Sequence, residues 1–161
     1  MDRFQRDLVA LLPRLRRFAR ALTGDTTQAD DLVQTAVERA LARRDQWRPE
    51  AALHSWMFTV MKNAWIDDRR AHNRRTALTR PAEEGERVAD PGAADLPART
   101  AIEQALGALP DEQRLAVTLV LVEGLSYAEA SRVLNIPEGT LTSRLVRGRT
   151  SLMASLQGLG A

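Results

Sequence analysis

The sequence of 161 residues predicts an all-α protein, with two small helical domains joined by a flexible linker. Apolar residues recur at spacings of three and four through most of the chain, which is the period of an amphipathic helix. Hydrophobic residues make up 44% of the sequence and aromatic residues only 4%, which favours small helical cores over a β-sandwich. A stretch rich in proline, glycine and acidic residues interrupts the helical period near the middle of the chain. This interruption divides the sequence into two domains.

The first predicted domain, residues 1–75, contains three helical patterns. The first pattern covers residues 4–22 and includes Pro13, which predicts a kink or a break into two helices. The second begins near Thr27, which with Asp30 could cap it, and combines a continuous apolar face with an acidic outer face. The third covers residues 55–75, apolar on nearly every side at first and increasingly basic from its middle. This last helix is expected to begin buried and to end as a cationic surface.

Residues 76–97 form the predicted linker, with three prolines, two glycines and no sustained apolar period. The linker is acidic, whereas the structured segment before it is basic, although the formal net charge of the whole chain is only +2. A second compact domain is predicted over residues 98–161. Because the linker is flexible, the two domains are expected to sample many separations in the free protein.

The second domain ends in a predicted helix-turn-helix. Ser126 and Glu129 have the spacing of a capping box for a first helix, and Pro137 suits the first turn of the next helix. On that second helix one stripe faces a core, formed by Leu141, Leu145, Gly148, Leu152 and Leu156. The opposite face carries Ser143 and Arg147, which suit a DNA major groove. An ordinary amphipathic helix with a solvated basic face is the alternative, but the capped preceding helix and the turn favour the DNA-binding interpretation.

Composition argues against several other functions. The chain has no cysteine, which excludes disulfides and thiolate metal sites. No apolar run approaches the roughly 18 residues of a membrane span, so we expect a cytoplasmic protein without membrane insertion. The two histidines, His54 and His72, are isolated in the sequence, and no glycine loop is built to hold phosphate. We therefore expect no catalytic residue, no metal and no cofactor.

Taken together, the motifs resemble those of the extracytoplasmic-function (ECF) sigma factors, compact bacterial transcription initiation factors. Residues 29–34 (ADDLVQ), 55–67 (SWMFTVMKNAWID) and 69–75 are similar to conserved region two of that family. Residues 109–114 (LPDEQR), 124–131 (GLSYAEAS) and 136–149 (IPEGTLTSRLVRGR) are similar to region four. The stretches LPRLRRFARALTG and SWMFTVMKN also resemble the alphaproteobacterial general-stress-response branch, in which a small anti-sigma protein holds the factor inactive.

The resemblance implies three sets of binding residues. The set that docks on core RNA polymerase is Asp30, Asp31, Leu32, Gln34 and Glu38. The set for the −10 promoter element is Trp47 and Arg48 in a base-capturing loop, with Lys62, Asn63, Arg69 and Arg70 beside it. The set for the −35 element is Thr142, Ser143 and Arg147 as base readers, with Thr140, Arg144 and Arg149 toward phosphates. Thr35 and Thr142 depart from the family, which commonly has glutamate and a basic residue there.

The implied function is that of a bacterial RNA polymerase sigma factor that directs promoter-specific transcription initiation in a stress response. Its implied partners are core RNA polymerase, promoter DNA and an anti-sigma factor that contacts both domains. One alternative is a conventional helix-turn-helix regulator that binds DNA without polymerase. Another is a helical adaptor whose acidic face binds a protein.

Overall fold

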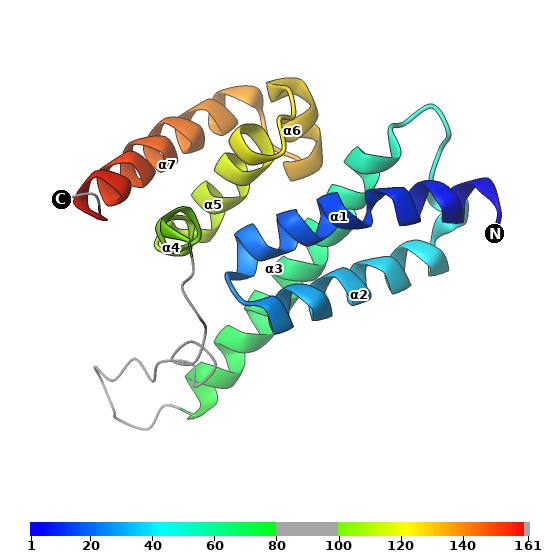
Figure 1. Ribbon diagram of the computed structural model, residues 1–161, viewed down its shortest axis with the longest axis horizontal. Helices are drawn as coiled ribbons and strands as arrows, with labels where there is room; N and C mark the ends of the chain where they lie inside the picture. Colours follow the sequence, from blue (N-terminus) through cyan, green and yellow to red (C-terminus); the bar gives the residue numbers. More distant parts are fainter. Residues whose placement is uncertain (80–99, 160–161) are drawn as a thin grey trace.

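The computed structural model describes residues 1–79 and 100–159, and within these residues it contains helices and no β-strand. Figure 1 shows the helices in two groups that lie side by side. The first unit comprises α1 (Arg3–Thr23), α2 (Thr26–Ala42), the 3₁₀ turn η1 (Arg44–Gln46) and α3 (Leu53–Thr79). The second unit comprises α4 (Ala101–Gly107), α5 (Asp111–Val117), the π-helical turn η2 (Thr118–Val122), α6 (Tyr127–Leu134) and α7 (Glu138–Leu159). The predicted all-α fold is confirmed.

Helix α1 is one continuous helix, so the break considered at Pro13 does not occur. Asp2 and Gln5 form a capping box at its start, and Gly24 ends it in the left-handed conformation with a φ of 67°. A proline inside a helix costs about 3 kcal/mol because it removes a hydrogen bond and crowds the preceding turn. The helix buries Leu8 before Pro13 and Phe18 after it, and this packing holds both halves in one element.

Two helix boundaries in the first unit differ from those expected. Asp25 caps α2 by accepting a hydrogen bond from the backbone N–H of Thr27, so neither Thr27 nor Asp30 is the cap. Helix α3 extends to Thr79, so the first four residues of the predicted linker are helical. Residues 80–97 of that linker lie outside the described residues.

The helix-turn-helix is confirmed. Ser126 accepts the backbone N–H of Glu129 at 3.1 Å and caps α6, which ends at Asn135 in the left-handed conformation with a φ of 54°. Helix α7 begins at Glu138, directly after Pro137. The stripe on α7 faces inward, with Leu141, Leu145 and Gly148 buried and Leu152 and Leu156 half-buried.

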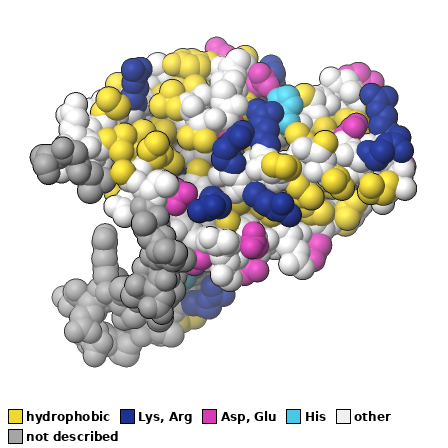
Figure 2. Space-filling model, viewed as in Figure 1, with side chains coloured by type: hydrophobic (Ala, Val, Ile, Leu, Met, Phe, Trp, Pro, Cys, Tyr) yellow, Lys and Arg dark blue, Asp and Glu magenta, His cyan; other side chains and the backbone are white. Residues whose placement is uncertain are grey.

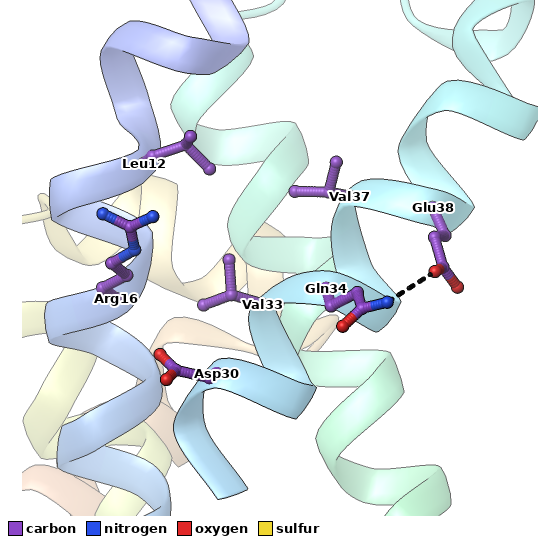
Figure 3. Close-up of a pocket in the computed structure, with 7 residues that line it drawn as sticks. All are labelled: Leu12, Arg16, Asp30, Val33, Gln34, Val37 and Glu38. Carbon is purple, nitrogen blue, oxygen red and sulfur yellow. Dashed lines mark hydrogen bonds between the residues drawn. The ribbon is translucent and has the colours of Figure 1, made fainter. Parts of the chain in front are cut away.

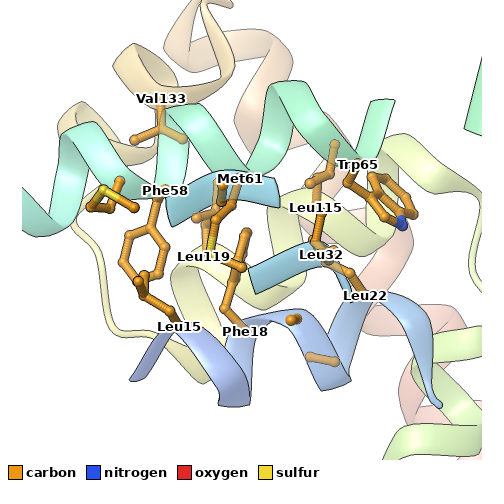
Figure 4. Close-up of a cluster of buried hydrophobic side chains, with 14 of the residues drawn as sticks. Leu15, Phe18, Leu22, Leu32, Phe58, Met61, Trp65, Leu115, Leu119 and Val133 are labelled. Atoms are coloured by element: carbon orange, nitrogen blue, oxygen red, sulfur yellow. The ribbon is translucent and has the colours of Figure 1, made fainter. Parts of the chain in front are cut away.

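The two units share a hydrophobic core. Figure 4 shows Phe18, Phe58 and Trp65 of the first unit in one cluster with Leu119 and Val133 of the second. Helix α1 contacts α4 and the η2 turn, while α3 packs against α6. The structure therefore holds the two units against each other. This differs from the sequence-based expectation that the two domains sample many separations.

A close approach of α7 to α5 at Gly148 leads to our first prediction. A Cβ atom at Gly148 would lie 2.7 Å from Val117 Cγ2 and 3.3 Å from Gln113 Cβ. Replacing glycine by alanine inside a helix normally stabilises it by about 1 kcal/mol, but overpacking costs about 1 to 3 kcal/mol. We therefore expect Gly148→Ala to lower the melting temperature. Gly139→Ala is the matched control, because nothing lies within 4 Å of a Cβ there. A higher melting temperature for Gly148→Ala would contradict the close packing.

Candidate functional site

The residues expected to dock on polymerase form a ridge along the outer face of α2. Asp30, Asp31, Gln34 and Glu38 are exposed, and Gln34 Nε2 donates a hydrogen bond to Glu38 Oε1 at 3.2 Å. Leu32 is buried, with 7% of its surface exposed. It supports the ridge from below and offers little surface to a partner. We call the four exposed side chains the α2 ridge.

A groove of about 450 Å³ lies beside the α2 ridge, between α1 and α2. Figure 3 shows Leu12 and Arg16 of α1 facing Val33 and Val37 of α2. Three members of the ridge complete the lining, namely Asp30, Gln34 and Glu38. A groove that combines apolar side chains with carboxylates suits a partner helix that carries both apolar and basic side chains.

Of the residues expected at the −10 element, some are exposed to solvent and others are buried or bonded to neighbouring residues. Arg48, Asn63 and Arg70 are exposed and available to a ligand. Trp47 is half-buried, because its ring lies 5.6 Å from that of Phe4 and its Nε1 donates to the carbonyl of Ala51 at 3.2 Å. The indole is therefore held against the first unit rather than extended into solvent.

Of the two remaining residues of the −10 set, Lys62 is buried and Arg69 is half-exposed but ion-paired. Lys62 is only 9% exposed, and burial lowers the pKa of its ammonium group. Arg69 donates two hydrogen bonds of 3.2 Å to the carboxylate of Asp111, which belongs to α5 of the second unit. In this arrangement Arg69 already has an anionic partner.

The residues expected at the −35 element gather on α7. Thr142 and Ser143 are exposed, and their hydroxyls donate to the carbonyls of Glu138 and Gly139 at 2.9 and 3.1 Å. Arg147 and Arg149 are exposed, and within the described ranges neither forms an ion pair. Thr140 and Arg144 are half-buried, with Arg144 3.7 Å from Glu112. The structure therefore presents an outward polar and cationic face on this helix.

Val146 was not among the predicted site residues. It lies between Ser143 and Arg147 on the outward face of α7 and is 60% exposed. An exposed branched side chain on such a face suits contact with the methyl group of thymine. Val146 follows Thr142 by four residues and Ser143 by three, and this helical spacing is the signal in the sequence that places it on the same face.

The polar contacts between the two units were also missed. Glu123, with a fully buried side chain, accepts hydrogen bonds from Arg14 and Arg17 of α1. Glu129 lies 3.3 Å from both His54 Nε2 and Ser55 Oγ of α3. The hydrogen bond from His54 is the largest of the contacts that lower the pKa of Glu129. The only sequence signal was the position of Glu123 at the end of an apolar run.

The described residues hold no group of three or more histidine, cysteine or acidic side chains placed to bind a metal ion. Among the described helices, none combines the length and apolar character needed to cross a membrane.

An acidic ridge lies on one helical unit and an outward polar and cationic helix face on the other, an arrangement that suits a transcription initiation factor. The model described as the Sigma2 domain of PhyR matches residues 8–62, and that described as Sigma-70, region 4 matches residues 99–152. The chain is 35% identical over 160 residues to the ECF RNA polymerase sigma factor EcfG of Rhodopseudomonas palustris, with 99% of this chain and 88% of that protein covered. The chain belongs to the ECF RNA polymerase sigma factors.

Other relatives agree with this family. The chain is 36% identical to the ECF sigma factor SigM of Mycobacterium tuberculosis over 138 residues, covering 86% of this chain and 69% of SigM. Its fold is similar to that of the sigma factor RpoE from Bartonella quintana, solved in complex with the anti-sigma factor NepR. The TM-score is 0.79 at 29% identity, with 96% of each chain covered. CnrH, solved with the cytosolic domain of CnrY, gives a TM-score of 0.65 at 25% identity, covering 96% of this chain and 90% of CnrH.

Proposed function

We propose that this chain directs core RNA polymerase to promoters that carry a −10 and a −35 element. The outward face of α7 is the observation that carries the proposal, because short polar groups and unpaired arginines there suit base edges and phosphates. The α2 ridge docks on a basic surface of polymerase, while Arg48, Asn63 and Arg70 contact the −10 element. The chain itself catalyses no reaction and acts in the cytoplasm.

Melting at the −10 element sets an energetic condition on this mechanism. Flipping a base out of the duplex costs a few kcal/mol, which contacts to the flipped base and the separated strand must offset. The loop beside Trp47 supplies contacts on one side, and polymerase holds the melted strand on the other. We therefore expect promoter opening to need polymerase, even though both DNA-reading surfaces belong to this chain.

The test is transcription from a defined promoter. With purified core polymerase, adding this chain should produce run-off transcripts from its promoter and none from a scrambled template. The chain without polymerase should give no specific shift of the same duplex. A specific shift by the chain alone, without polymerase-dependent transcription, would indicate a conventional helix-turn-helix regulator instead.

Arg147→Ala tests the reading face of α7. Losing a bidentate contact to a base costs about 1 to 3 kcal/mol of discrimination. We expect the variant to weaken holoenzyme binding to the correct −35 sequence more than to a scrambled one. Arg149→Ala is the matched control, since a phosphate contact should be lost equally on both sequences. If Arg147→Ala also affects both equally, Arg147 binds phosphate and does not read a base.

We further propose that an anti-sigma factor restrains this chain in a stress response. RpoE, to which this chain is similar over nearly its whole length, was solved with the anti-sigma factor NepR. An inhibitor that contacts both units would gain affinity from having two sites on one chain. We expect such an inhibitor to displace core polymerase in competition binding. An inhibitor that binds together with core polymerase would contradict a steric mechanism.

A further inference from the structure

The ion pairs that join the two units all have the same polarity. Within the described residues, four arginine–carboxylate ion pairs and one histidine–carboxylate hydrogen bond cross between the units, and in each the nitrogen group belongs to the first unit and the acid to the second. They are Arg14–Glu123, Arg17–Glu123, Arg20–Glu103, His54–Glu129 and Arg69–Asp111, with atoms 2.8 to 3.5 Å apart. Carboxylates of the second unit thus pack against a basic face of the first unit. Figure 2 shows Lys and Arg side chains, with a histidine beside them, across the middle of the molecule where the units meet.

The contact at Glu123 is the most buried of these. Arg17 donates from Nε to Glu123 Oε2 at 2.9 Å and from an Nη atom to Oε1 at 2.8 Å, which is a two-pronged contact. Arg14 donates from Nε to Oε1 at 3.1 Å and from an Nη atom to the backbone carbonyl of Glu123 at 2.9 Å. A guanidinium fork of this kind binds phosphate as readily as carboxylate. One carboxylate cannot neutralise two arginines, so this part of α1 keeps a net positive charge.

The basic face continues from α1 onto α3. The guanidinium carbon of Arg14 lies 5.2 Å from the ring centre of Phe58, one helical turn before Lys62. Lys62 in turn lies two turns from Ser55 and two turns from Arg69, and both of those residues contact the second unit. Lys62 is therefore on the covered stripe of α3, and within the described ranges no ion pair compensates its burial.

We infer that Arg14 and Arg17 extend the −10 surface onto α1 as a binding site for DNA phosphates, and that the carboxylates of the second unit cover this site in the closed arrangement. DNA and the second unit then compete for the same cations. Separating the units would free Arg14, Arg17 and Arg69 together from their carboxylate partners. The inference rests on the proposed function, since it assigns DNA as the ligand of the first unit.

The test measures binding of the full chain to a fluorescent single-stranded DNA of about 20 nucleotides, without polymerase. Glu123→Gln removes the carboxylate charge and should raise affinity about tenfold, within the usual range of coupling between competing interactions. Asp7→Asn is the control for net charge, because it removes one carboxylate at an exposed position on α1, where Asp7 pairs only with Arg3 of the same helix among the described residues. Equal effects of the two substitutions would show that net charge alone is responsible and would overturn the inference.

Two further variants identify the phosphate site. In the Glu123→Gln background, replacing Arg14 and Arg17 by alanine should remove the gained affinity, whereas Arg16→Ala should retain most of it. Arg16 is the matched control because it lies on the same helix but faces the groove toward α2. If Arg16→Ala weakens DNA binding as much as the average effect of replacing Arg14 or Arg17, α1 has no specific phosphate site. Should Glu123→Gln fail to fold, Asp111→Asn releases Arg69 at a half-exposed position and carries the same expectation.

The competition between DNA and the second unit is tested by measuring the distance between dyes placed on the two units. Because the chain has no cysteine, Ala42→Cys on α2 and Ser151→Cys on α7 place one dye at an exposed site on each unit. Adding the oligonucleotide should lengthen the distance between the dyes, and binding without any lengthening would overturn the competition. These measurements contain no polymerase. A failure of polymerase-dependent transcription is therefore distinguishable from a failure of this inference.

Discussion

Replacing Arg114 with methionine is expected to lower the free energy of unfolding by about 3 kcal/mol, the cost of removing one partner from a buried charged network. Arg114 is 8% exposed, and its guanidinium donates to three backbone carbonyls. Two of these, Gly107 at the end of α4 and Leu109 in the turn before α5, lie at 2.9 and 3.0 Å, and the third is Leu22 of α1 at 2.8 Å. Methionine fills a similar space but leaves these carbonyls without a donor.

Chemical denaturation of Arg114→Met and of a control variant would measure this loss of stability. The matched control is Arg132→Met on α6, because Arg132 is exposed and forms no ion pair among the described residues. A surface change of this kind normally alters stability by about 0.5 kcal/mol or less. Equal effects of the two substitutions would contradict the role assigned to Arg114 in joining α1 to the second unit.

Asp31→Arg is expected to abolish binding to core polymerase while leaving the fold intact. Asp31 is exposed on the α2 ridge, so the new side chain meets no buried group. Placing a cation against a basic partner costs several kcal/mol, and about 3 kcal/mol corresponds to roughly a hundredfold loss of affinity. A pull-down with core polymerase in the absence of DNA measures this loss.

Asp45→Arg provides the matched control for the polymerase prediction. Asp45 is also exposed, but it lies in the η1 turn away from the ridge on α2. The control should bind polymerase as the unchanged protein does. Unchanged affinity for Asp31→Arg would remove the α2 ridge from the docking surface, whereas loss in both variants would indicate an effect of overall charge.

The helix-turn-helix was predictable because its signals are local. Ser126, Glu129 and Pro137 determine where its helices begin, and the leucine spacing on α7 determines which face is buried. The outward direction of Arg147 follows from the same spacing. Predictions of this kind depend on residues within a few turns of one another.

The contact between the units was not predictable in the same way. Lys62 was assigned to an exposed basic surface because its neighbours along the chain are polar, yet residues far away in sequence cover that part of α3. The partners of Glu123 were not predictable either, because an acidic residue after an apolar run gives no indication of which arginines it will contact. The continuity of α1 across Pro13 likewise depends on tertiary packing that the local preference of proline does not include.

The carboxylates that cover the basic face are part of the same chain, so closure is a unimolecular equilibrium. Its equilibrium constant does not depend on the amount of protein, whereas a separate inhibitor loses its effect once the sigma factor outnumbers it. Synthesis of more protein would thus leave the open fraction unchanged. Salt would change it through the pairs that solvent reaches, Arg20–Glu103 and Arg69–Asp111, because exposed ion pairs are screened at high ionic strength and buried ones much less. The arginine–carboxylate pairs between the units therefore make the open fraction depend on the ionic environment rather than on protein abundance.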